Sequence, residues 1–213
     1  FHCEIDVVND QLVTAYTQGR DLRFATRQVN GTWSLQTIDA QFRSLGREAD
    51  LVVYGGEPVI AHRDFTFGQL RVTRRSNGQW SSVATVLQNE AFGFRPTIHV
   101  DENGLRVFHG TVPDEIDQSG DGTQWYVYGP LAAQNYFQFN FDNTSAGGEQ
   151  AVGTIDENVA LFSRRRQRSA LFGARDSLVL WTDIDSGTSV ELESGESGDQ
   201  RRLYRFLNFK SDP

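Results

Sequence analysis

Residues 22–34 (LRFATRQVNGTWS) return with little change as residues 70–81 (LRVTRRSNGQWS), and this repeated block decides the fold. Apolar and polar residues alternate in its first half, which is typical of a half-buried β-strand. In both copies an Asn-Gly pair then supplies the residues that a type I′ hairpin turn requires, and a tryptophan opens the next strand. The second copy begins 48 residues after the first. This spacing is close to the length of one four-stranded propeller blade.

The same order of short apolar runs and Gly- or Asn-containing turns continues along the chain, and no convincing stretch has helical periodicity. We therefore expect an all-β fold, a β-propeller of four-stranded antiparallel blades. Its blades should number four to five, with five favoured if the chain closes on itself. The length of 213 residues suits a single domain, 1–213. The predicted blades are 4–39, 50–88, 96–131 and 169–209, and we interpret 132–168 as an insertion or a degenerate blade.

Composition excludes some classes of partner. The net charge of −8 and the pI near 5.0 argue against nucleic acid, because binding to phosphates requires a basic surface. No apolar run approaches the roughly 18 residues of a membrane helix, so we expect no membrane span. The chain starts at Phe1 and has no methionine, which indicates a processed or trimmed product. Cys3 is the one cysteine, so it is a free thiol, a buried small side chain or a link to another chain.

The blade pattern resembles that of secreted bacterial β-propellers of the sialidase-like superfamily. Residues 119–125 (SGDGTQW) are similar to the Asp-box of that superfamily, with one residue missing before the second glycine. The resemblance implies a hairpin between the third and fourth strands of a blade and a secreted, periplasmic or cell-surface location. Enzymatic members bind the substrate carboxylate through three arginines. Phe94-Arg95-Pro96 is reminiscent of the motif that carries the first of them, which makes Arg95 a candidate ligand-binding residue.

Superposition of the copies aligns three polar residues at the ends of the predicted second strands. These residues are Tyr16, His62 and His109, spaced 46 and 47 residues apart. If second strands lie towards the propeller interior, the two imidazoles and the phenol could converge to bind a metal ion or line a polar pocket. The alternative is that each side chain caps its own blade and hydrogen-bonds to a neighbouring turn.

An acidic loop precedes Trp125, and its residues Asp117, Ser119 and Asp121 match the opening of a calcium-binding loop. Oxygen ligands at alternate positions suit Ca²⁺, which is the cofactor this loop would hold. The bidentate glutamate that closes an EF-hand is replaced by Tyr128. The alternative is therefore a solvated hairpin without metal.

No complete catalytic signature occurs in the sequence, which favours a binding module over an enzyme. We predict a non-enzymatic, extracytoplasmic β-propeller that binds a protein, a glycan or a small ligand on one face. One alternative is a sialidase-like glycoside hydrolase. Another is one chain of a larger processed propeller, in which a further chain completes the assembly.

Overall fold

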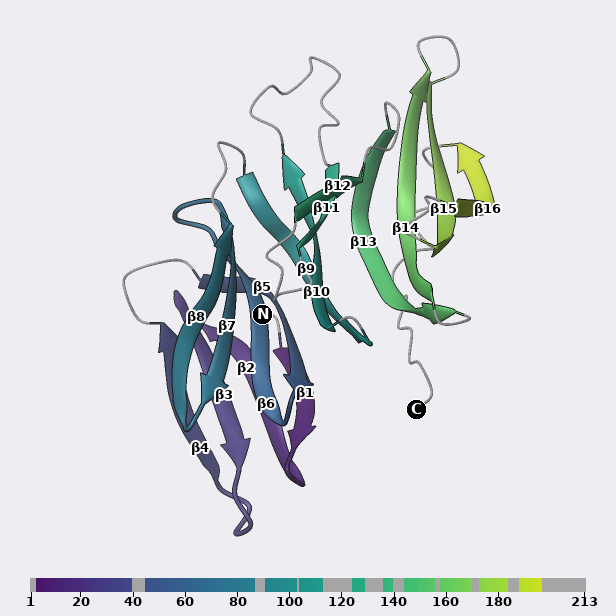
Figure 1. Cartoon of the computed structure of the whole chain (residues 1–213). Coiled ribbons are helices and arrows are strands. Elements are labelled where there is room, and N and C mark those ends of the chain that lie inside the picture. The colour runs from purple at the N-terminus through teal and green to yellow at the C-terminus, as the bar shows by residue number, and fades with distance from the viewer. Residues whose placement is uncertain are drawn as a thin grey trace. The chain divides into compact units, whose positions relative to one another are not determined.

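The computed structural model of the chain consists of β-strands joined by turns and loops (Figure 1). Sixteen strands, β1 to β16, form four antiparallel sheets of four strands each within the residues that the structure describes. The prediction of an all-β fold built from four-stranded antiparallel blades is confirmed. The described residues are 3–39, 45–86, 91–102, 104–112, 124–128, 136–139, 144–155, 158–169, 173–183 and 188–196.

The first sheet is a meander in which each strand pairs with the next along the chain. Its strands are β1 (Cys3–Val8), β2 (Gln11–Gln18), β3 (Asp21–Arg27) and β4 (Trp33–Asp39). Asn9 and Asp10, with φ of 48° and 62°, form the two-residue turn between β1 and β2. This left-handed backbone is the one that a type I′ turn requires.

The second sheet repeats this order. Its strands are β5 (Leu45–Tyr54), β6 (Glu57–Asp64), β7 (Gln69–Ser76) and β8 (Gln79–Val86). Gly55 and Gly56 both have positive φ and connect β5 to β6 in two residues. Val8 and Tyr54 therefore occupy the same position, the last residue before a two-residue hairpin turn.

The two Asn-Gly pairs form different turns. Asn77 and Gly78 have φ of 50° and 80°, which confirms the predicted type I′ turn between β7 and β8. The same prediction is wrong for the first copy, because only Gly31 has positive φ there. In that copy five residues separate the paired Arg27 and Trp33, and the Gln28 N–H donates to the Thr32 carbonyl at 2.7 Å. The first copy has one residue more than the second between the paired arginine and tryptophan, and this residue makes room for the wider loop.

The third and fourth sheets complete the described strands. Their strands are β9 (Ala91–Asp101), β10 (Gly104–Val112), β11 (Gln124–Tyr128), β12 (Tyr136–Phe139), β13 (Thr144–Ile155), β14 (Asn158–Ser169), β15 (Gly173–Asp183) and β16 (Thr188–Glu196). The fourth sheet thus spans 144–196, whereas the sequence predicted a blade at 169–209 after an insertion. Arginines at 164–166 and 168 interrupt the apolar alternation of β14, and no Asn-Gly-x-Trp motif marks this sheet. The predicted strand at 203–209 lies outside the described residues.

Two compact units make up the chain. One comprises Phe1–Asp114 with Tyr126–Phe137, and the other comprises Glu115–Trp125 with Gln138–Pro213. Whether they form the predicted single domain, and how many blades a complete propeller would have, stays a prediction. The described residues include no helix that is long and apolar enough to cross a membrane.

In the first unit the sheets are held together by two apolar clusters. Residues of the first and second sheets form one cluster: Val13, Ala15, Leu22, Phe24, Ala49, Leu51 and Ile60. Residues of the second and third sheets form the other: Val59, Ala61, Leu70, Val72, Ile98, Leu105 and Val107. Both faces of the second sheet are therefore packed against a neighbouring sheet.

Candidate functional site

Strand alternation gives the first sheet two faces with different surroundings. The inner face, which carries Val13, Ala15, Leu22 and Phe24, packs on the second sheet. The opposite face, which we call the open face, carries the other set of alternating residues. Its members, read from the strand register, are Cys3, Ile5, Val7, Leu12, Thr14, Tyr16, Asp21, Arg23, Ala25, Arg27, Trp33, Leu35 and Thr37.

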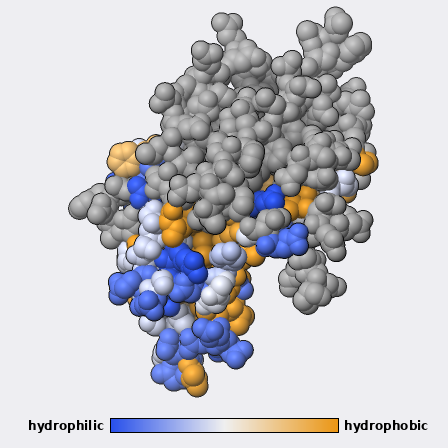
Figure 2. Space-filling model, viewed as in Figure 1, coloured by the Kyte–Doolittle hydropathy of each residue, from blue (hydrophilic) through white to orange (hydrophobic). Residues whose placement is uncertain are grey.

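Several apolar side chains of the open face are accessible. Its large apolar side chains keep high exposed fractions: Ile5 62%, Val7 54%, Leu35 60% and Trp33 44%. Figure 2, viewed from the side of the second sheet, shows apolar residues among hydrophilic ones on the described part of the surface. A cluster of exposed apolar side chains on one sheet face is the usual mark of a contact surface.

The second sheet shows what such a face does when it is covered. Leu51, four residues before the first residue of its hairpin turn, occupies the position of Ile5, yet it is only 7% exposed because the first sheet packs on it. Trp80 follows an Asn-Gly turn as Trp33 does. Trp80 pairs with Arg75 and Trp33 pairs with Arg27, in each case the last arginine of the preceding strand. The open face is therefore the repeat equivalent of a buried inter-sheet surface.

Trp80 contacts two residues of the first sheet. Its ring meets Phe24 edge to face, with ring centroids 5.0 Å apart and an interplanar angle of 71°. Its indole Nε1–H donates to Gln36 Oε1 at 3.3 Å. The Arg75 guanidinium also lies over the Phe24 ring, 5.6 Å from its centroid. A tryptophan at this position thus anchors one sheet to the next.

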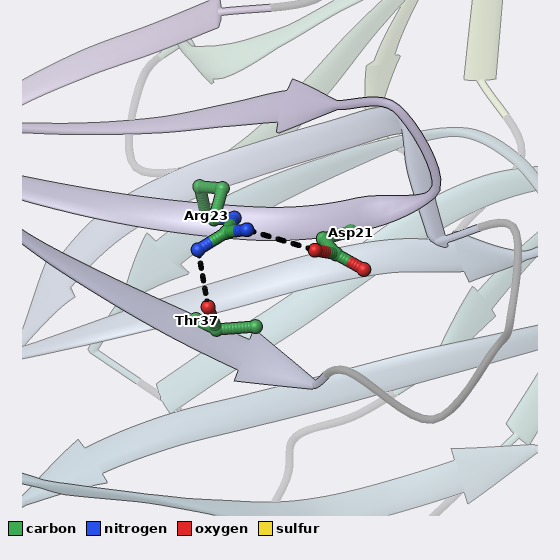
Figure 3. A network of polar contacts seen from close by, with 3 residues as sticks. All are labelled: Asp21, Arg23 and Thr37. Atoms are coloured by element: carbon green, nitrogen blue, oxygen red, sulfur yellow. Dashed lines mark hydrogen bonds and ion pairs between the residues drawn. The ribbon is translucent and has the colours of Figure 1, made fainter.

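A polar network borders the open face. Arg23 Nη2 pairs with Asp21 Oδ2 at 2.9 Å, and Arg23 Nη1 donates to Thr37 Oγ1 (Figure 3). The three side chains come from β3 and β4, and the guanidinium lies between the carboxylate and the hydroxyl. The network places polar side chains beside the exposed apolar ones of the same face, a mixture that protein–protein interfaces contain.

Aspartates of the first strands link neighbouring sheets. Asp6 Oδ1 accepts from the Val7 N–H at 2.7 Å, and Asp6 Oδ2 accepts from the Val53 N–H of the second sheet at 3.1 Å. Asp50 repeats the arrangement one sheet further on: it accepts from its neighbour Leu51 and from Ile98 of the third sheet. β5 and β9 are edge strands, so some of their backbone N–H groups point away from their one partner strand. The carboxylates of Asp6 and Asp50 accept hydrogen bonds from two of these groups, those of Val53 and Ile98.

A second polar group occupies the end of β6, where His62, Arg63 and Asp64 are all buried. Asp64 Oδ1 accepts from the Thr66 and Phe67 N–H groups at 3.0 and 3.3 Å, and Asp64 Oδ2 lies 3.1 Å from Arg71 Nε. These bonds fix the turn that leads into β7. Burial lowers the pKa of Arg63, and the coulombic effect of Glu48 opposes that shift.

The three aligned residues of the sequence lie on three different sheets. Tyr16 and His62 are equivalent in register: Tyr16 pairs with Cys3 and Arg23, and His62 pairs with Ala49 and Arg71. Tyr16 belongs to the open face, whereas His62 is buried on the corresponding face of the second sheet. His109 is buried at a register shift between Phe108 and Gly110. Their convergence on one ligand stays a prediction.

The remaining predicted site residues are placed in part. Arg95 lies in β9, and its side chain is outside the described residues. Asp117, Ser119 and Asp121 also lie outside them, so the calcium loop stays a prediction. Within the described part of the chain no group of three His, Cys, Asp or Glu side chains is arranged to hold a metal ion.

The sequence did not identify the open face as a site. Ile5, Val7 and Leu35 read as ordinary alternating strand residues. The available signal was the repeat itself, because Trp33 shares the motif of Trp80, a residue that packs on a neighbouring sheet.

Comparison with known proteins adds little about function. No family model matches the chain, and no curated protein matches it. Among solved structures it is similar to an exo-1,5-alpha-L-arabinanase from a bovine ruminal metagenomic library, with a TM-score of 0.49 and 11% sequence identity. The match covers 90% of this chain and 77% of that one. The resemblance to sialidase-like propellers therefore stays a prediction, and a function has to be argued from the chain's own residues.

Proposed function

We propose that the chain is a non-enzymatic, extracytoplasmic β-propeller module that binds another protein through the open face of its first sheet. The observation that carries the proposal is the exposure of Ile5 and Trp33 at positions whose repeat equivalents, Leu51 and Trp80, contribute to a buried inter-sheet surface. Exposing these side chains to water costs free energy that a partner would recover, at about 25 cal/mol per Å² of apolar surface buried.

The shape and chemistry of this face favour a protein over a glycan or a small ligand. Its apolar side chains are spread over two strands at opposite edges of a sheet, β1 and β4, so a complementary partner has to be about as wide as the sheet. Trp33 and the Asp21–Arg23–Thr37 border supply the aromatic anchor and the polar rim that protein interfaces use.

Photo-crosslinking from Cys3 tests the proposal, because this exposed thiol lies on the open face and is the one cysteine of the chain. A benzophenone-maleimide on Cys3 is irradiated with proteins secreted by the source cells and with the purified chain itself. We expect a covalent adduct to a protein, lost in Leu35→Lys, which lies at the opposite edge of the sheet from the probe.

Val29→Lys is the matched control. Val29 is fully exposed in the turn between β3 and β4 and lies off the sheet face, so this substitution should leave the adduct unchanged. An adduct that persists in Leu35→Lys, or no protein adduct above background, would contradict the proposal. Binding to a glycan array that Leu35→Lys leaves unaltered would also place recognition elsewhere.

A further inference from the structure

Strand β14 of the fourth sheet changes from apolar to basic within a few residues. Val159, Ala160 and Leu161 are buried, whereas the arginines at 164–166 and 168 follow directly after Phe162 and Ser163. The strand lies inside the sheet, with β13 on one side and β15 on the other. The register with these two strands therefore gives the place of each arginine on the sheet.

Strand alternation assigns three of these arginines to one face of the sheet. Arg164, Arg166 and Arg168 occupy alternate positions, so consecutive members are about 6.8 Å apart along the strand. We call these three residues the arginine stripe. Arg165 belongs to the opposite face of the same strand. The stripe is thus a row of three positive charges, about 14 Å long, in a chain whose net charge is −8.

The register places one carboxylate directly beside the arginine stripe. Asp176 of β15 is the partner of Arg166. The other register partners of the stripe are uncharged: Ser145, Gly147, Ala174 and Leu178. Glu193 of β16 pairs with Leu178, so its backbone is two strands, about 10 Å, from that of Arg164. The two outer arginines of the stripe therefore have no acidic register partner on the described strands.

Arginines in strands of the first unit are matched one to one with carboxylates. Four guanidinium groups there have a nitrogen 2.7–3.4 Å from a carboxylate oxygen. The pairs are Arg23–Asp21, Arg71–Asp64, Arg74–Glu57 and Arg106–Asp101. The arginine stripe departs from this ratio. Three like charges in one row repel one another, and an anion that lies along the row removes this repulsion.

We propose that the arginine stripe binds an anionic polysaccharide, an extended sugar polymer that carries sulfate or carboxylate groups. A polymer with repeated anionic groups suits a linear row of charges, because a single small anion cannot span about 14 Å. The planar guanidinium can donate two parallel hydrogen bonds to such a group. The stripe belongs to the fourth sheet and the open face to the first, so this inference is independent of the proposed function.

The residues beside the stripe favour a polysaccharide over single-stranded nucleic acid. Proteins that bind single strands place aromatic side chains along the path of the backbone, so that bases stack on them. No register partner of the stripe on the described strands is aromatic. Phe162 precedes the stripe on the same face, but its partners Ala151 and Leu180 are apolar and assign it to the apolar half of the sheet.

Fluorescence anisotropy tests the inference with two labelled probes, a heparin fragment for sulfate groups and an oligogalacturonate for carboxylate groups. The wild type should bind at least one of them, and added salt should weaken the binding. Arg164→Gln should weaken it about tenfold, the effect expected for loss of a charged hydrogen bond. Arg165→Gln, the matched control, removes the same charge from the opposite face of the same strand and should leave binding unchanged.

Arg168→Gln, one residue from the end of β14, provides the second test if circular dichroism shows that Arg164→Gln is unfolded. Binding of the heparin fragment alone would assign the stripe to sulfate groups, and binding of the oligogalacturonate alone would assign it to carboxylate groups. Equal weakening by Arg164→Gln and Arg165→Gln, or no binding of either probe, would overturn the inference. Single-stranded DNA that binds as tightly as these probes and loses affinity in Arg164→Gln would also overturn it, in favour of a nucleic acid.

Discussion

At the scale of single residues, the aspartates of the first strands have the clearest structural role. Each carboxylate accepts one N–H from its own strand and one from the next sheet: Asp6 bonds Val7 and Val53, and Asp50 bonds Leu51 and Ile98. Sequence could not reveal this role, because an aspartate in a strand reads as a solvated residue until the neighbouring sheet is placed beside it.

Removal of one such carboxylate should weaken the sheet-to-sheet contact. Asp50→Ala leaves the Ile98 N–H without its acceptor, and we expect it to lower the free energy of unfolding by about 1–3 kcal/mol. Urea denaturation followed by circular dichroism measures the change. Glu102→Ala, at an exposed residue of the turn after β9, is the control and should have little effect. Equal stability of the two variants would contradict the role assigned to Asp50.

His99 should make the stability of the chain depend on pH. Burial lowers its pKa below the ordinary value of 6.5; the nearby Asp101 carboxylate opposes this shift, and Arg106, its cross-strand neighbour, adds to it. The unfolded chain therefore binds a proton at a pH where the folded chain does not, so stability falls as the pH decreases below about 6.5.

The variant His99→Gln removes this titrating group. We expect the decrease in melting temperature between pH 7 and pH 5 to be smaller in this variant than in the wild type. Parallel curves for the two proteins over that range would show that His99 does not contribute.

At the scale of strands and turns, much of the fold could be predicted. The hairpins at Asn9-Asp10, Gly55-Gly56 and Asn77-Gly78 carry residues that adopt positive φ readily, so the turn chemistry marks where strands end. The fourth sheet was harder, since its arginine-rich strand β14 has no regular apolar alternation and no Asn-Gly-x-Trp motif. The five-residue loop at 28–32 shows that one dipeptide can serve two different turns.

The turn at Gly78 provides a test of backbone conformation alone. Its φ is 80°, and an added Cβ would meet no atom within 4 Å. Gly78→Ala should therefore lower the free energy of unfolding by about 1–2 kcal/mol through the left-handed backbone and not through a clash. Asn77→Gly at the preceding residue is the control and should change stability much less. Similar losses in both variants would contradict this account.

At the scale of the whole molecule, the repeat explains why the candidate site was not predicted. Trp33 and Trp80 share one motif, but Trp80 packs on a preceding sheet and Trp33 is exposed. Exposure is a property of the assembled sheets and not of the motif. Tyr16, His62 and His109 illustrate the same point. Alignment of the copies predicted that they occupy similar positions, but it could not predict how far the neighbouring sheets bury each side chain.

The inter-sheet aspartates have a consequence for aggregation. The first strand of each sheet lies at an edge, and an extended segment of another molecule can add to such a strand through its unpaired N–H and C=O groups. Asp6 and Asp50 occupy N–H groups of β5 and β9 with a charged side chain. They therefore protect these strands from addition of a foreign strand, and their loss would expose sites at which amyloid-like pairing could begin.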